Sequence, residues 1–250
     1  IYHIGGLTMQ EYSTSGVPSA SEGNMGLLQR IINVFAAPSK SFAAVRENPR
    51  WIAPTVLVLL LSLIMTIYIA PAIQKEQHEK MVTQMEDRGL DQEQIDSAIE
   101  RINSPVMKYV MYGSALIGGL AVILVMGGVW LFVARTLLGG TTTYKHMLEV
   151  VSLSMLIPSV GMLLKAPIMR FKETMNVHFS LATFMPDSAR ESFIYKFLMN
   201  TDLFNIWYIG VLCIGIAVVA GLKVKKVWPL VVGLLVLWYL GSAAMGGLFS

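Results

Sequence analysis

Residues able to do chemistry are sparse in the apolar part of this chain, and they do not fall into catalytic pairs. The four histidines, none with a Cys or second His at metal-ligand spacing, are His3, His78, His146 and His178. Ser152, Ser154 and Ser159 share an apolar segment, but a serine nucleophile needs a base at the same depth, and Lys165 lies at the segment's end. P-loop, GxGxxG and GxSxG patterns are absent. We therefore expect no catalytic residue, no cofactor, no metal and no enzyme activity.

Glu149 is the one charged residue in these apolar segments, which makes it a functional candidate. It lies at helical spacing from His146 and Lys145. Because an ion or proton carrier would need more charged groups, we favour a carboxylate that is paired or snorkels at the interface. The alternative is a transporter or channel for a lipid or small molecule. It predicts a polar cavity reaching mid-membrane near Glu149, Ser152 and Pro158.

Composition indicates that lipid is the medium around most of the chain. Only 14% of the 250 residues are charged, against about 25% in soluble domains, and the mean hydropathy is +0.59. A net charge of +3 is too small to indicate nucleic acid as a partner. These properties predict an all-α, polytopic membrane helix bundle.

Five apolar segments predict five transmembrane helices, since about 20 apolar residues cross a bilayer core. The third is short and holds Pro158, so a re-entrant or interfacial helix is its alternative. The expected spans lie near residues 51–70, 107–134, 147–165, 203–222 and 227–248, and the loops 71–106 and 166–202 lie outside.

The charge distribution predicts a cytoplasmic N-terminus and an extracytoplasmic C-terminus. With that orientation the cytoplasmic segments carry a net charge of +5 and the opposite side −2, which together give the total of +3. The Lys223, Lys225 and Lys226 cluster contributes most to this asymmetry. Trp51 and Trp228 then lie at the cytoplasmic interface.

Residues 1–26 are expected to be a flexible cytoplasmic N-terminus, and residues 27–50 two short amphipathic helices separated at Pro38. Apolar residues recur at helical spacing around Leu28 and Ile32, with Arg30 on another face. This pattern suits a membrane surface. A cytoplasmic lid packed on the bundle fits the pattern equally.

The first external loop is predicted to be a helical hairpin. Gly89 supplies its turn, and Asp91 is placed to cap the second helix with Gln94 as its capping-box partner. Leu90 and Ile95 have the spacing of the hydrophobic staple around that cap. In the second external loop, Asp202 is expected to cap the fourth span.

Three blocks resemble the bacterial branch of the Ypt/Rab-interacting protein (Yip) domain family. The first has Phe35, Pro38 and Phe42 ahead of a segment ending at Trp51; the second covers residues 139–146. The third covers residues 201–207 and ends at Trp207. Pro158 matches a frequent proline of the family's third span. The resemblance implies five spans over residues 51–250, in the cytoplasmic (inner) membrane of a bacterium.

Eukaryotic members of the family resemble scaffolds for Rab GTPases, which bacteria lack, whereas some bacterial relatives accompany export ABC transporters. The resemblance thus implies a membrane scaffold or accessory subunit that binds another membrane protein, an export ABC transporter being one candidate, or a second copy of itself. Membrane lipids are expected as further partners. A lipid-active enzyme ranks lowest. The residues expected at the partner or membrane interface are Phe35, Pro38, Phe42, Trp51, Glu149, Pro158 and Trp207.

Overall fold

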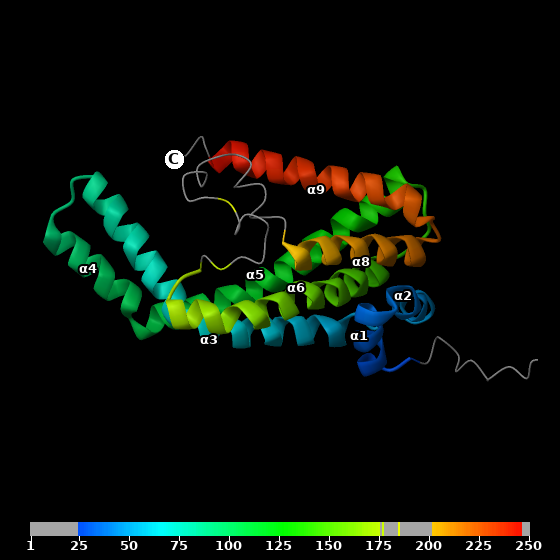
Figure 1. The fold of residues 1–250 in the computed structure, drawn as a ribbon, viewed down its shortest axis with the longest axis horizontal. Helices are drawn as coiled ribbons and strands as arrows, with labels where there is room; N and C mark the ends of the chain where they lie inside the picture. Colours follow the sequence, from blue (N-terminus) through cyan, green and yellow to red (C-terminus); the bar gives the residue numbers. More distant parts are fainter. Residues whose placement is uncertain (1–24, 176, 178–184, 186–201, 247–250) are drawn as a thin grey trace, which may run out of the picture.

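The chain is an all-helical bundle with a helical hairpin projecting from one end (Figure 1). The computed structural model describes residues 25–175, 177, 185 and 202–246. Most of the predicted N-terminal segment 1–26 and most of the loop 166–202 lie outside these residues. The elements, in chain order, are α1 (Leu27–Ala36), α2 (Pro38–Glu47), α3 (Ile52–Asp87), α4 (Gln92–Asn103), α5 (Pro105–Phe132), the π-helix η2 (Val133–Leu137), α6 (Tyr144–Lys172), α8 (Leu203–Ala220) and α9 (Val224–Gly246).

Four of the described helices are long and apolar enough to cross a membrane: α3, α5 continued by η2, α6 and α8. The fifth predicted span corresponds to α9, which has 23 residues and no charged residue after Lys226. The fold class predicted from composition, a polytopic all-α membrane bundle, is confirmed. The number of five spans stays a prediction.

The segment with the ambiguous third span forms a single continuous helix, α6, of 29 residues. Pro158 and Pro167 both lie inside it, and each removes one backbone hydrogen bond. α6 is the most buried of the four candidate spans and packs against α3, α5 and α8, so packing supports the helix around both prolines. Its length and hydropathy are sufficient for a complete crossing.

The hairpin begins inside α3, which does not end with the apolar run at Pro71 but continues to Asp87. At 1.5 Å per residue, its 36 residues extend about 54 Å, well beyond a hydrocarbon core of about 30 Å. Gly89 turns the chain with φ +72°, a conformation that glycine adopts without strain. The Asp91 carboxylate then accepts a hydrogen bond from the Gln94 backbone N–H at 2.9 Å, as the capping pattern predicts.

The main core surrounds α6 and α8, where fully buried residues such as Leu153, Ile157 and Ile216 meet. The close approach of α6 and α8 depends on two glycines. A Cβ on Gly215 would lie 2.7 Å from the Val150 side chain, and one on Gly161 would lie 2.7 Å from the Phe204 ring. Small residues here serve packing within the bundle.

Candidate functional site

A buried ion pair joins α1 to α6 at the end of the bundle where α2 lies. The Arg30 Nη1 donates to Glu149 Oε1 at 2.5 Å, and the two side chains are only 1% and 0% exposed. Arg30 Nε also donates to the Met25 carbonyl at 3.1 Å, and its Nη2 donates to the Ala44 carbonyl at 3.3 Å. The sole charged residue predicted in the spans is therefore neutralised by a partner 119 residues away.

Further hydrogen bonds complete this buried polar centre. The second carboxylate oxygen of Glu149 accepts the backbone N–H of Arg50. The Ser41 hydroxyl donates to the Arg30 carbonyl at 2.9 Å. One turn along α6, the hydroxyls of Thr55 and Ser152 lie 2.7 Å apart. We call Arg30, Ser41, Thr55, Glu149 and Ser152 the polar centre.

Aromatic side chains fasten α1 and α2 to α8. The Phe35 and Trp207 rings meet edge to face, with centroids 5.5 Å apart and planes at 76°, the geometry that aromatic pairs prefer. Phe42 is fully buried and its ring fills the space over Gly215. Together with the polar centre, these contacts place α1 and α2 against the bundle as a lid.

The remaining predicted site residues occupy different surroundings. Pro38 begins α2 at its first turn, where the missing N–H costs nothing. Trp51 is half-buried at the start of α3, and its carbonyl accepts the Thr55 hydroxyl at 2.7 Å. Pro158 lies apart from all of these, in the wall of a groove between α3, α5 and α6.

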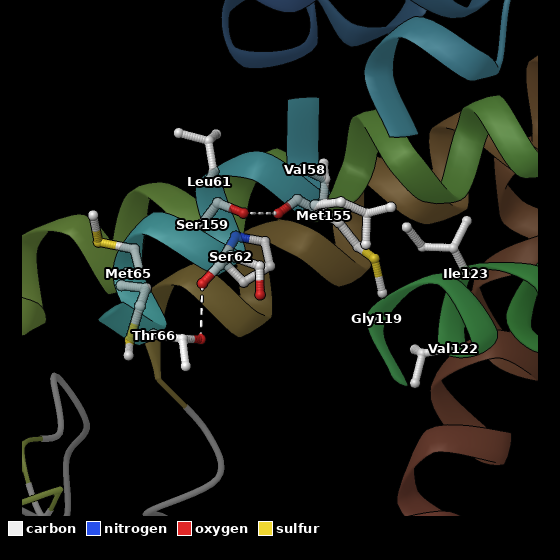
Figure 2. Close-up of a pocket in the computed structure, with 13 residues that line it drawn as sticks. Val58, Leu61, Ser62, Met65, Thr66, Gly119, Val122, Ile123, Met155 and Ser159 are labelled. Carbon is white, nitrogen blue, oxygen red and sulfur yellow. Dashed lines mark hydrogen bonds between the residues drawn. The ribbon is translucent and has the colours of Figure 1, made fainter. Parts of the chain in front are cut away.

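That groove has a volume of about 340 Å³ (Figure 2). Its wall is mainly apolar and includes Met65, Met155 and Met162. Two of its three hydroxyls are bonded within their own helices: Thr66 donates to the Ser62 carbonyl at 2.8 Å, and Ser159 donates to the Met155 carbonyl at 2.8 Å. The groove therefore offers shape and apolar contact, with little free polar capacity.

Sequence reasoning placed Glu149 and Ser152 beside a polar cavity in its alternative model. In the structure both are fully buried in the polar centre, and only Pro158 of the three residues named lines the groove. Arg30 was not predicted as a site residue, because the sequence pattern placed it only on a different helical face from the apolar residues and gave it no partner. The signal that could have found it is the lone buried carboxylate, which requires a cation.

At the other end of the described bundle, Lys165 pairs with Asp202. The same aspartate caps α8 through the Asn205 backbone N–H at 2.8 Å, so the predicted N-cap is confirmed. Lys165, at the end of the serine-bearing segment, is therefore held in an ion pair.

These features define an integral membrane protein in which the buried charged side chains of the described residues form ion pairs within the chain. A model of the Yip1 domain matches residues 32–245, so the chain belongs to the Yip1 domain family. It is also similar to the membrane protein YknW of Bacillus subtilis, with 26% identity over 201 residues, covering 79% of this chain and 81% of that protein. No solved structure matches it.

Proposed function

We propose that this protein is a non-catalytic membrane scaffold or accessory subunit that binds another membrane protein, with an export ABC transporter as the candidate partner. We further propose that it resides in the inner membrane of a bacterium with the N-terminus cytoplasmic. Family membership supports the general class, because the resemblance on Phe35, Pro38 and Phe42 extends over most of the chain. The partner is inferred from bacterial members that accompany such transporters.

The observation that carries the proposal is the closure of the polar centre. Glu149 is the charged group expected at membrane depth, and both of its carboxylate oxygens are bonded inside the protein. A carboxylate that relays ions or protons must reach water or its cargo, whereas this one holds α1 against α6. Its role in the structure is to fix α1 against α6, and a scaffold requires such a fixed arrangement of helices.

The outward faces of α5 supply a surface for a partner helix. Gly113, Gly118 and Gly128 have open space where a Cβ would lie, in contrast to the packed Gly127, where a Cβ would be 2.7 Å from Leu148. Small outward residues allow another helix to approach closely. Large apolar side chains flank them, with Ile117 73% exposed.

The test uses a photo-crosslinking amino acid placed at Val125, on the outward face of α5, in cells expressing the full chain. We expect a crosslink to the membrane subunit of an ABC transporter, and copurification of that subunit in mild detergent. The matched position is Ile64, similarly exposed on α3, where we expect no crosslink. A crosslink to a second copy would favour a homo-oligomer, and a lone, uncrosslinked chain would refute the scaffold.

The groove supports a second candidate, a carrier for a lipid or apolar small molecule. Its wall lies within the apolar stretches of α3, α5 and α6 and is mainly apolar, and the Thr66 and Ser159 hydroxyls in it are already bonded within their own helices. Ser62→Phe would fill it, whereas Ile64→Phe adds the same ring on an outward face of α3. A carrier loses transport of a fluorescent lipid between vesicle leaflets with the first variant only; equal behaviour of the two variants removes this candidate.

A further inference from the structure

One end of the bundle brings together α2, the start of α3, η2, the start of α6 and the α8–α9 link (Figure 1). These segments carry exposed basic side chains. In segments 25–50, 133–146 and 221–226 the one exposed acidic residue is Glu47. We call these side chains the basic end: Lys40, Arg46, Arg50, Arg135, Lys145, Lys223, Lys225 and Lys226. Eight positive charges against one negative charge make this the most strongly charged region that the structure describes.

Tertiary contacts fix these segments against one another. The Arg46 guanidinium lies 3.5 Å from where a Cβ would stand on Gly221, and the Arg46 carbonyl accepts His146 Nε2–H at 3.1 Å. Lys226 Nζ donates to the Leu138 carbonyl at 2.8 Å. The charges therefore belong to one positioned surface instead of independent flexible tails.

The basic end lacks internal counterions, unlike the opposite end of the bundle. There, two of the described lysines form ion pairs with exposed or half-buried carboxylates: Lys75 with Glu173 at 2.9 Å and Lys80 with Glu76 at 2.7 Å. None of the eight side chains of the basic end has a carboxylate within ion-pair distance in the part of the chain that the structure describes. Like charges held this close repel one another, so an external anion would stabilise the surface.

The surroundings identify the anion as one attached to a membrane. Leu28 and Ile32 on α1 are 70% and 56% exposed beside this surface, as in helices whose apolar face enters the headgroup boundary. Trp51 and Trp228 begin α3 and α9 at the same end, where indole rings favour the interface. We propose that the basic end binds the phosphate groups of anionic phospholipids, phosphatidylglycerol being the probe of choice.

Native mass spectrometry of the full chain in uncharged maltoside micelles tests this directly. We expect phosphatidylglycerol to be retained over phosphatidylcholine with the same acyl chains. Each basic residue near a membrane surface contributes about 1 kcal/mol, or about fivefold, so Arg46→Gln, Lys145→Gln and Lys223→Gln together should weaken phosphatidylglycerol binding roughly a hundredfold. Equal retention of the two lipids by the unchanged protein would overturn the proposal.

A second triple variant removes the same charge from exposed residues of the hairpin region, namely Arg88→Gln, Arg101→Gln and Lys108→Gln. It should leave lipid retention within about twofold, and a loss equal to that of the basic-end variant would refute the assignment. Should the basic-end variant not fold, salt titration of the unchanged protein decides. Between 0.1 M and 1 M NaCl the screening length falls from about 10 to about 3 Å, so phosphatidylglycerol retention should fall. Retention that is the same at both salt concentrations contradicts the proposal.

Two competitors distinguish a lipid from other anions. Glycerol phosphate carries the same phosphate without acyl chains, and polyglutamate carries the charge of an acidic protein segment. We expect neither to displace phosphatidylglycerol at millimolar concentration. Displacement by glycerol phosphate would assign a site for a soluble phosphate, and displacement by polyglutamate would assign a protein-docking surface; either result overturns the lipid proposal. The scaffold function does not depend on the outcome.

Discussion

Breaking the Arg30–Glu149 pair from one side should destabilise the bundle more than removing both charges together. In Arg30→Met, the Glu149 carboxylate stays buried with one remaining donor, the Arg50 backbone N–H. In Glu149→Met, the guanidinium stays 1% exposed with only the carbonyls of Met25 and Ala44 as partners. Leaving an uncompensated buried charge costs about 3–5 kcal/mol, so each single variant should lose about that much.

The double variant removes both charges and replaces them with flexible apolar side chains. Its main unsatisfied group is the Arg50 backbone N–H, for which a cost of about 1–3 kcal/mol is expected. The double variant should thus be more stable than either single variant, with a coupling free energy of roughly 3 kcal/mol or more between the two sites.

The assay is reversible unfolding of the full chain in mixed micelles with increasing sodium dodecyl sulfate, followed by circular dichroism and tryptophan fluorescence. The matched control is Lys75→Met with Glu173→Met, an ion pair of 2.9 Å whose side chains are 48% and 54% exposed. We expect no measurable change there, since exposed pairs contribute little. If Arg30→Met alone unfolds at the same detergent fraction as the unchanged protein, the pair does not hold the lid, and the reasoning fails.

Three further predictions concern packing, capping and orientation. Gly215→Val should displace α2 from α8 and lower the melting temperature, whereas Gly210→Val, with open space around it, should not; equal melting curves would refute the packing argument. Asp91→Ala should cost about 1 kcal/mol and speed amide exchange in α4 while leaving α6 unchanged; unchanged exchange in α4 would show that the cap is dispensable. In a chain without its native cysteine, a membrane-impermeant thiol reagent added to intact cells should label Ser97→Cys in the hairpin and not Lys225→Cys; the reverse pattern would invert the predicted orientation.

Sequence reasoning succeeded where the determining interactions are local. The caps at Asp91 and Asp202 each need only a side-chain oxygen and a backbone N–H three residues later, and short polar residues at that spacing are readable. The long apolar runs indicated spans for a similar reason, because hydropathy is summed within one segment. The helical hairpin could be predicted from the cap at Asp91 and the ends of the apolar runs on either side of it, with Gly89 marking its turn.

The sequence could not assign the partner of Glu149. Several cations were available to a carboxylate near the membrane interface, and Lys145 and His146 stood closest in the chain. The structure selects Arg30, 119 residues away, because α1 packs across the end of α6. Such a choice depends on the arrangement of helices, which hydrophobic periodicity within one helix does not encode.

The π-helix η2 was also missed, for a different reason. Val133–Leu137 follows α5 directly, without a proline or glycine to mark the change. Its wider turn ends where Gly139 takes a positive φ of +67° and the Thr141 N–H reaches the Ala220 carbonyl at 3.1 Å. The wider turn thus leads into a link that contacts α8, and such a contact between distant segments cannot be predicted from one segment alone.

The two interpretations left open for residues 27–50 prove to be compatible. With Arg30 turned inward to meet Glu149 and Val34 buried on the same side of α1, Leu28 and Ile32 lie on the other side and are exposed. In water this arrangement would be unfavourable, because each exposed apolar side chain forgoes about 1.5–3 kcal/mol of burial. We expect a bilayer interface to remove this cost, because Leu28 and Ile32 would then contact lipid. On that prediction, the lid and the amphipathic helix correspond to the two faces of α1, and contact with lipid would favour the closed lid.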